Sequence, residues 1–236
     1  MNQPNTFTLV LLPGMDGTGE LFLPFITAIG GAFDTLVVDY PTDQPLSYAA
    51  LETLVRKALP TDRPYIVLGE SFSGPIAVSL AASQPAQLKG LVLCSTFVKN
   101  PRPVFRKMGL LVNALPLGQA PIRWISRLLL GRFSTAALRS ALNQAISRVT
   151  PQVMRARLRA VLAVDVSTEL TQVSVPALYL RATRDWVVPA TASALVLQLN
   201  PNVQIADVDA PHCLLQAKPD AAARHISAFA RTLKDA

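Results

Sequence analysis

The sequence predicts an α/β fold, with about six mainly parallel strands in one sheet and helices on both faces. Three observations support this prediction. Apolar runs recur along the 236-residue chain, and most are continuous rather than alternating, as in strands buried on both faces. Segments of helical character separate these runs, as the crossovers between parallel strands require. A chain of this length can also bury a substantial core without dividing into separate domains.

The individual elements follow from these apolar runs and from the Pro and Gly residues between them. The strands are expected, in chain order, at residues 7–12, 35–39, 65–69, 90–95, 176–181 and 203–208. Two of the connecting helices are expected at residues 48–59 and 75–82. The interval between the fourth and fifth strands is much longer than one crossover helix needs, so it predicts an insertion.

The segment after the third strand indicates nucleophilic catalysis. Its sequence is Gly69-Glu70-Ser71-Phe72-Ser73-Gly74, and a run of small residues follows it. A serine becomes a useful nucleophile when a sharp strand-to-helix turn exposes it and a base removes its proton. Ser71 is therefore the expected nucleophile. Ser73 replaces the second glycine of the usual G-x-S-x-G pattern, which its small size allows. The alternative is a turn rich in Ser and Gly that carries no chemistry.

A carboxylate and a histidine are expected to follow such a serine, in that chain order. His212 comes shortly after the last expected strand, whereas His225 lies in a segment of helical periodicity and is interpreted as exposed. Asp185 lies in the loop after the fifth strand, where it can orient an imidazole and stabilise its cationic form. Its alternative role is a helix N-cap. Three partners in this order, each near a strand end, predict a triad of Ser71, His212 and Asp185.

With these motifs the chain resembles the α/β-hydrolases over essentially its whole length. The loop Pro13-Gly14-Met15-Asp16-Gly17-Thr18-Gly19 follows the first strand, where that family often has a His-Gly pair. The resemblance places the two oxyanion-hole amides on Met15 and Phe72. Backbone amides suit this task because they point at the developing oxyanion without reorganising. Nucleotide binding by the loop is not expected, since it lacks both a Walker-type Lys-Ser/Thr pair and the G-x-G-x-x-G spacing.

The predicted insertion covers residues 99–164, and the expected hydrolase core covers residues 1–98 and 165–236. Helices within the insertion are expected at residues 104–115, 121–130, 135–149 and 151–164. The family resemblance identifies the insertion as a lid over the active site. Its apolar residues either line an acyl pocket or pack on the core. These residues are Phe105, Met108, Leu111, Trp124, Ile125, Leu128 and Phe133.

The insertion also carries the basic charge of the protein. It contains 12 Lys and Arg residues and no Asp or Glu, whereas the whole chain has 22 basic and 15 acidic residues. The insertion therefore has a charge of +12 and the remainder −5, which together give the net charge of +7. Solvated faces normally mix both signs, so this composition favours an anionic partner.

Three anionic partners fit a basic helical surface: nucleic acid, an anionic membrane surface and an acidic protein. Nucleic acid is not expected, because no recognised binding motif accompanies the charge. A membrane surface suits amphipathic basic helices and is the less favoured of the remaining two. The chain resembles the pimeloyl-[acyl-carrier protein] methyl ester esterases of biotin synthesis, whose lid arginines hold the acidic acyl carrier protein. On this resemblance, the carrier-binding candidates are Arg139, Arg148, Arg155, Arg157 and Arg159.

The expected reaction is the hydrolysis of an acyl ester by two-step acyl transfer to water. A thioesterase is the closest alternative, because the same groups cleave a thioester. An acyltransferase is the second, since relatives with a Gly-Glu-Ser-Phe elbow include acyltransferases. A non-catalytic module that binds a carrier or a lipid is the third. No cofactor or metal is expected, because the sequence offers no cluster of metal-binding residues.

The remaining features concern the compartment. The two cysteines, Cys94 and Cys213, are interpreted as free core thiols. No apolar run is long enough to span a bilayer, and the first residues lack the basic region of a secretory signal. A cytoplasmic location is therefore expected.

Overall fold

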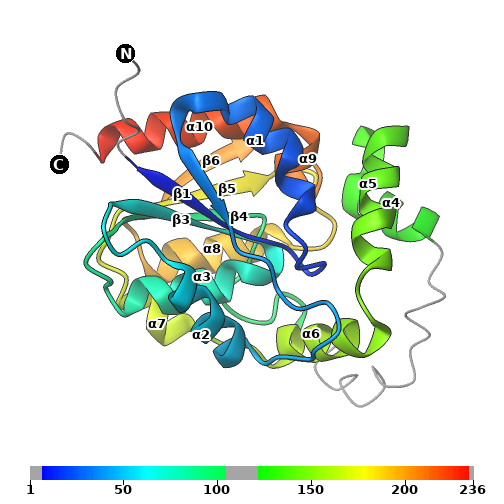
Figure 1. The fold of residues 1–236 in the computed structure, drawn as a ribbon, viewed down its shortest axis with the longest axis horizontal. Helices are drawn as coiled ribbons and strands as arrows, with labels where there is room; N and C mark the ends of the chain where they lie inside the picture. Colours follow the sequence, from blue (N-terminus) through cyan, green and yellow to red (C-terminus); the bar gives the residue numbers. More distant parts are fainter. Residues whose placement is uncertain (1–6, 105–121, 234–236) are drawn as a thin grey trace.

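The computed structural model describes residues 7–104 and 122–233 of the chain. Six parallel strands form one sheet in the order β2-β1-β3-β4-β5-β6 (Figure 1). The strands are β1 (Thr8–Leu12), β2 (Asp34–Val37), β3 (Tyr65–Glu70), β4 (Leu88–Cys94), β5 (Ala177–Ala182) and β6 (Gln204–Val208). This confirms the predicted fold class. The chain runs outward from β1 to β2 and then returns to β3 on the other side of β1, and crevices at such reversals commonly hold ligands.

The central strands explain the continuous apolar runs in the sequence. Every residue of β1 and of β3 is buried, whereas the edge strands β2 and β6 are largely half-buried or exposed. Successive side chains of β1 point to opposite faces of the sheet. Leu9 and Leu11 pack into one hydrophobic cluster, and Val10 and Leu12 into another on the opposite face. The sheet therefore lies between two apolar layers.

Helices cover both faces of the sheet (Figure 1). One face carries α1 (Leu23–Ile29), α9 (Leu214–Ala217) and α10 (Pro219–Thr232). The other carries α2 (Tyr48–Ala58), α3 (Gly74–Ala82), α7 (Ser167–Thr171) and α8 (Ala190–Leu199). Short 3-10 turns are η1 (Glu20–Phe22), η2 (Gly30–Ala32), η3 (Ser71–Ser73) and η6 (Gly131–Phe133). Among the described residues, none of the helices is both long and apolar enough to cross a membrane.

Between β4 and β5 the described residues form α7 and three helices that precede it in the chain: α4 (Ile122–Leu130), α5 (Ala136–Ser147) and α6 (Pro151–Ala163). Thr135 and Thr150 cap the last two, since their side chains accept hydrogen bonds from backbone amides of the first helical turn. These helices agree with three of the four expected in the insertion. The helix expected at residues 104–115 lies almost wholly outside the described residues. Figure 1 shows α4, α5 and α6 beyond the carboxyl ends of the strands.

Candidate active site

The turn after β3 holds Ser71 in a strained conformation. Its φ angle is 49°, in the left-handed region that residues other than glycine seldom adopt. The turn also needs small neighbours. A Cβ on Gly69 would lie 2.8 Å from the Cβ of Ala77, and one on Gly74 would lie 1.9 Å from Oγ1 of Thr96. The close approach of β3 and α3 therefore accounts for Gly69, and the close approach of α3 to Thr96, after β4, accounts for Gly74.

Ser73 is fully buried, and its hydroxyl links two parts of the site. The hydroxyl donates a hydrogen bond to the backbone carbonyl of Pro13, in the loop after β1. It pairs on its other side with the hydroxyl of Tyr40, at 2.7 Å between the two oxygens. Glycine at this position would leave the carbonyl of Pro13 and the hydroxyl of Tyr40 without the Ser73 hydroxyl as a hydrogen-bond partner. The departure from the G-x-S-x-G pattern therefore ties the turn of Ser71 to the loop after β1.

The structure brings Ser71, His212 and Asp185 together from three loops at the carboxyl edge of the sheet. Oγ of Ser71 lies 2.8 Å from Nε2 of His212, and Nδ1 of His212 lies 2.7 Å from Oδ2 of Asp185. The other carboxylate oxygen of Asp185 accepts bonds from the amides of Val187 and Val188, at 2.7 and 2.9 Å. The side chains of His212 and Asp185 are 7% and 4% exposed. This chain of hydrogen bonds can pass a proton from the serine to a fixed imidazole.

The loop after β1 lies against this chain of hydrogen bonds. Met15 lines the same cavity as Ser71, and Phe72 directly follows Ser71 in η3. Their assignment as oxyanion-hole residues stays a prediction. Asp16 is a turn residue, because its carboxylate accepts hydrogen bonds from the amide and the hydroxyl of Thr18. The loop is thus held in part by its own side chains.

Arg157 of α6 also holds this loop, which corrects its place among the carrier-binding candidates. The side chain is 2% exposed. Its guanidinium donates hydrogen bonds to the carbonyls of Met15 and Asp16, each at 2.8 Å, and to the carbonyl of Pro41 at 2.9 Å. An arginine that is buried and satisfied in this way offers no donor to a carrier protein. The prediction that included Arg157 in the carrier-binding set was wrong.

Glu70 and Gln216 form a buried polar pair beside the triad. Each is 6% exposed, and Nε2 of Gln216 donates to Oε1 of Glu70 at 3.0 Å. Burial raises the pKa of Glu70 to about 7; the hydrogen bond from Gln216 opposes the rise, and the charge of Asp16 adds to it. This pair was not predicted from the sequence. Its only signal is a glutamine inside the otherwise apolar segment after His212.

A cavity of about 380 Å³ opens beside Ser71 and His212. Its walls from the insertion are apolar and include Leu129 of α4, Leu142 of α5 and Leu158 of α6. Its polar lining includes Asp16, Glu70 and Gln216.

The apolar residues expected in the insertion divide between this cavity and the surface. Ile125 and Leu128 line the cavity, whereas Trp124 is 72% exposed. Phe133 contacts the cationic groups of Arg132 and Lys218. The remaining three, Phe105, Met108 and Leu111, lie outside the described residues.

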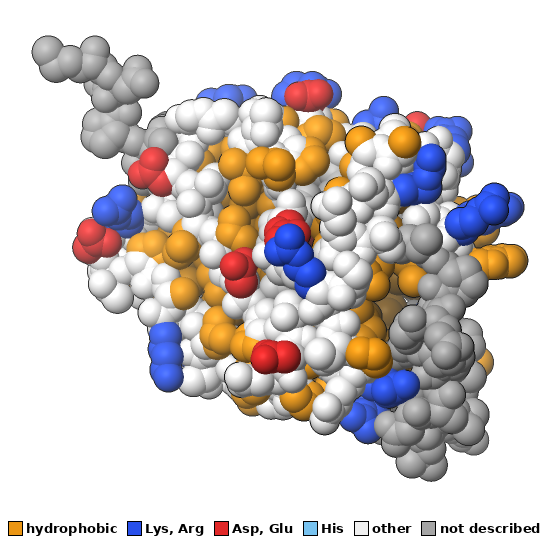
Figure 2. Space-filling view, turned by 45° about the vertical axis from the view of Figure 1, so that its right-hand side comes forward, with side chains coloured by type: hydrophobic (Ala, Val, Ile, Leu, Met, Phe, Trp, Pro, Cys, Tyr) orange, Lys and Arg blue, Asp and Glu red, His pale blue; other side chains and the backbone are white. Residues whose placement is uncertain are grey.

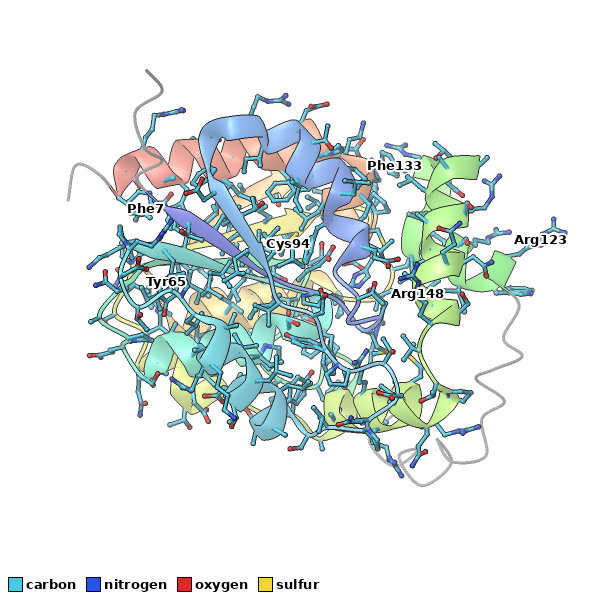
Figure 3. All side chains as sticks on the ribbon, viewed as in Figure 1. Phe7, Tyr65, Cys94, Arg123, Phe133 and Arg148 are labelled. Carbon is cyan, nitrogen blue, oxygen red and sulfur yellow. The ribbon has the colours of Figure 1, made fainter. Side chains whose placement is uncertain are left out.

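The basic insertion is partly neutralised by acids outside it. Arg132 pairs with Asp209 at 2.7 Å, Lys99 pairs with Asp165 at 2.8 Å, and Arg148 pairs with Glu20. Lys and Arg side chains nevertheless gather toward the right of the face in Figure 2. Arg123 extends outward from α4, and Arg148 directly follows the last residue of α5 (Figure 3).

The other carrier-binding candidates differ in their surroundings. Arg139 is exposed and donates to the hydroxyl of Ser134 at 3.0 Å. Arg159 is exposed and Arg155 is half-buried. Carrier binding by these residues and by Arg148 stays a prediction. Within residues 7–104 and 122–233, the His, Cys, Asp and Glu side chains form no group that could hold a metal ion.

Comparison with known proteins places this site in a family. Residues 47–214 match the family described as serine aminopeptidase, S33. The chain is 27% identical over 224 residues to RutD of Yersinia enterocolitica, which is named as a carbamate hydrolase; the match covers 85% of this chain and 78% of RutD. A shorter match, 33% identical over 81 residues, is to the chloroplastic phytyl ester synthase 1 of Arabidopsis thaliana, and it covers 32% of this chain and 12% of the synthase.

A solved structure supports the fold. An esterase from Thermogutta terrifontis superposes with a TM-score of 0.83, at 17% identity, over 98% of this chain and 92% of the esterase. The family match covers most of the chain, and the parallel sheet agrees with it. The protein is therefore an α/β-hydrolase and belongs to the serine aminopeptidase S33 family.

Proposed function

We propose that this protein hydrolyses carboxylic esters, with Ser71 as the nucleophile, His212 as the general base and acid, and Asp185 as the residue that orients His212. The observation that carries the proposal is the unbroken chain of hydrogen bonds from Ser71 through His212 to Asp185. This chain opens onto a mainly apolar cavity of about 380 Å³, which suits an acyl group held beside the serine.

The first step forms an acyl-enzyme. Nε2 of His212 takes the proton of Ser71 while Oγ attacks the ester carbonyl, and the carbonyl oxygen becomes an oxyanion. The amides of Met15 and Phe72 are proposed to bind this oxyanion; loss of one such donor typically costs about 3 kcal/mol of transition-state stabilisation. The imidazolium of His212 then protonates the leaving alcohol. Asp185, fixed by two backbone amides, stabilises that imidazolium.

The second step releases the acid. Water enters beside His212, which takes a proton from it as the water oxygen attacks the acyl carbonyl. The second oxyanion collapses, Oγ of Ser71 leaves and takes the proton back from His212, and the free serine returns. The same groups cleave thioesters, so thioester hydrolysis remains the nearest alternative reaction.

A carbamate is a second candidate substrate, because the likeness to RutD covers 85% of this chain. Acyl transfer to an alcohol is favoured only by the short match to phytyl ester synthase 1, which covers 12% of that protein. Comparison of kcat/KM for matched ester, thioester and carbamate substrates distinguishes hydrolysis of these three substrate classes. Product analysis with an added long-chain alcohol tests transfer to an acceptor other than water.

The triad is tested with p-nitrophenyl butyrate and a labelled fluorophosphonate. Ser71→Ala and His212→Ala are expected to lower kcat by at least 1,000-fold, since each removes a group that acts in the transition state. His225→Ala, on α10, is expected to stay within a few-fold of wild type and serves as the matched control. The fluorophosphonate should attach at Ser71 alone. Wild-type turnover in Ser71→Ala would exclude this nucleophile.

We further propose that the acyl ester is linked to an acyl carrier protein, as in the pimeloyl methyl esters of biotin synthesis. This finer proposal rests on the family resemblance and on the absence of Asp and Glu from residues 99–164. Arg139 and Arg159 are the exposed candidates for contact with the carrier, together with Arg148, which already pairs with Glu20. An anionic membrane surface is the alternative partner.

A further inference from the structure

The cavity beside Ser71 has a polar corner, formed by Glu70, Gln216 and Asp16, that the proposed hydrolysis does not use. All three side chains line the cavity, and they are 6%, 6% and 7% exposed. The walls contributed by α4, α5 and α6 are apolar. Buried polar groups are normally paired, so a corner of this kind in an apolar cavity needs an explanation.

One hydrogen-bond acceptor in the corner has no partner among the described residues. The amide nitrogen of Gln216 donates to Glu70 at 3.0 Å. The amide oxygen of Gln216, Oε1, is buried and has no hydrogen-bond partner among the residues that the structure describes. Asp16 uses one carboxylate oxygen to accept both bonds from Thr18. Ionised carboxylates accept but do not donate, and no described group donates to Gln216 Oε1, so a group that pairs with this oxygen has to bring its own donor.

We propose that this corner binds a neutral hydrogen-bond donor, a hydroxyl or an amide N–H, on the acyl part of the substrate. The inference rests on the proposed ester hydrolysis and does not depend on a carrier protein. Its position follows from the chain: Glu70 precedes the nucleophile, and Gln216 follows His212 by four residues. The donor therefore lies within a few bonds of the scissile carbonyl. The preferred substrates are hydroxyacyl or amidoacyl esters rather than plain fatty esters.

The selectivity has a direct physical cause. Gln216 Oε1 has no hydrogen-bond partner among the described residues, so a plain acyl chain leaves it unpaired, whereas a substrate hydroxyl beside it supplies a donor. Sites built to hydrogen-bond a substrate hydroxyl discriminate strongly against the analogue that lacks it, for this reason. The proximity of Asp16 and Glu70, whose charges interact, makes the corner rich in acceptors. Above pH 7, where Glu70 is ionised, an ether oxygen, which only accepts, gains nothing there.

The experiment compares p-nitrophenyl esters of hexanoate that carry hydrogen, hydroxyl or methoxy at C2 or C3. The wild type is expected to prefer one hydroxy ester over plain hexanoate by at least tenfold in kcat/KM, with the methoxy ester no better than hexanoate. Gln216→Met keeps the length of the side chain but removes the acceptor. In this variant the kcat/KM values for the hydroxy ester and for plain hexanoate should differ by less than threefold. Gln172→Met, an exposed glutamine on the core, is the matched control and should keep the wild-type ratio.

The outcomes separate this inference from the proposed function. Three outcomes would overturn the proposed role of the polar corner and leave the proposed function standing. They are hydrolysis of hexanoate with no preference for a hydroxy ester, an equal preference for the methoxy ester, and a hydroxyl preference that is unchanged in Gln216→Met. Absence of all ester hydrolysis overturns the proposed function. In that case calorimetric titration of Ser71→Ala with methyl 3-hydroxyhexanoate, methyl 2-hydroxyhexanoate and methyl hexanoate still decides the corner. The polar corner is supported if one hydroxy ester binds at least tenfold more tightly than methyl hexanoate and this difference is lost when Gln216→Met is added. Equal binding of the three esters overturns the polar corner.

Discussion

Arg157 shows how one side chain can connect the insertion to the catalytic loop. Its planar guanidinium donates to three backbone carbonyls, a geometry that a lysine ammonium does not reproduce. It also occupies the space beside Gly17, where a Cβ would lie 2.6 Å from a guanidinium nitrogen. Burial of this cation lowers the pKa of Arg157, yet the three acceptors keep it satisfied. The loop that contains Met15 is therefore held from α6.

Replacement of Arg157 by Met is expected to lower kcat for p-nitrophenyl butyrate by at least tenfold. The loop carbonyls lose their donors, so the amide proposed for the oxyanion hole is no longer held in place. Arg157→Lys should recover only part of the rate. Arg159→Met, an exposed substitution on the same helix, is the control and should stay within twofold of wild type. Wild-type kcat in folded Arg157→Met would show that the loop needs no support from α6.

Glu70 gives the protein a pH-dependent stability with a defined sign. Its pKa is about 7 in the folded protein and 4.5 in the unfolded chain. Between these values the unfolded chain has released the proton and the folded protein has not, so the free energy of unfolding falls as pH rises. The groups that act on this carboxyl are Gln216, Asp16 and His212. The contribution of Glu70 to this fall is on the order of 3 kcal/mol.

Urea denaturation at pH 5 and pH 7.5 measures this effect. Glu70→Gln removes the titrating group, so its unfolding free energy should fall less than that of the wild type over this interval. The difference between the two changes isolates Glu70, because the other titrating groups are common to both proteins. Equal pH dependence in the two proteins would mean that Glu70 titrates near its ordinary pKa in the folded state.

At the scale of elements, the turn between β3 and α3 is joined to the loop after β1 through Ser73. The family pattern has glycine at this position, and serine is tolerated because its hydroxyl points at Pro13 and Tyr40. The sequence alone showed that serine is small enough. It could not show the hydrogen bonds, because their partners lie 60 and 33 residues away in the chain. Contacts over such distances depend on the complete fold.

Restoring the usual glycine by Ser73→Gly is therefore expected to destabilise the protein. The substitution leaves the carbonyl of Pro13 and the hydroxyl of Tyr40 buried without the Ser73 hydroxyl. A buried polar group that loses its hydrogen-bond partner typically lowers the free energy of unfolding by about 1–3 kcal/mol. A double-mutant cycle of Ser73→Ala and Tyr40→Phe, followed by urea denaturation, measures the link directly. A coupling free energy of at least about 0.5 kcal/mol is expected between the two hydroxyls. Additive effects would show that the two hydroxyls contribute independently.

The sequence predicted the elements better than their packing. Continuous apolar runs located all six strands, because parallel strands buried on both faces leave that pattern. The order of Ser71, Asp185 and His212 likewise predicted three residues that the fold brings together. Arg157 was misjudged because it lies between two other arginines. The spacing did contain a signal, since Val153, Arg157 and Val161 are each four residues apart and all are buried on one face of α6.

For the whole molecule, the separation of charge between insertion and core has a structural consequence. The insertion is +12 and the remainder −5, and in the part of the chain that the structure describes Lys99–Asp165, Arg132–Asp209 and Arg148–Glu20 are ion pairs that join the two parts. Their side chains are substantially exposed, so each pair contributes little stability by itself. Together they favour one position of the insertion relative to the catalytic loops. Part of the basic composition is thus used inside the molecule, which reduces the charge that the insertion can present to a partner.

The carrier proposal makes a prediction about three exposed arginines of the insertion. A variant with Arg123→Glu, Arg139→Glu and Arg159→Glu should lose at least tenfold in kcat/KM on a carrier-linked pimeloyl methyl ester. Hydrolysis of p-nitrophenyl butyrate should stay within twofold, because the triad and Arg157 are unchanged. The matched control reverses three exposed charges on the core, Lys57→Glu, Arg224→Glu and Arg231→Glu, and should retain carrier-linked turnover. Equal losses in both variants would indicate a general effect of net charge.

Ionic strength and vesicles then distinguish the two anionic partners. Salt screens exposed charges beyond roughly 8 Å at physiological ionic strength, so carrier-linked turnover should fall as salt rises while small-ester turnover stays constant. A membrane surface would give the same dependence on salt, because it too is recognised by charge. Sedimentation with anionic vesicles separates the cases. Strong vesicle binding, lost in the insertion variant, together with unchanged carrier-linked turnover in that variant, would assign the basic surface to lipid instead of to an acyl carrier protein.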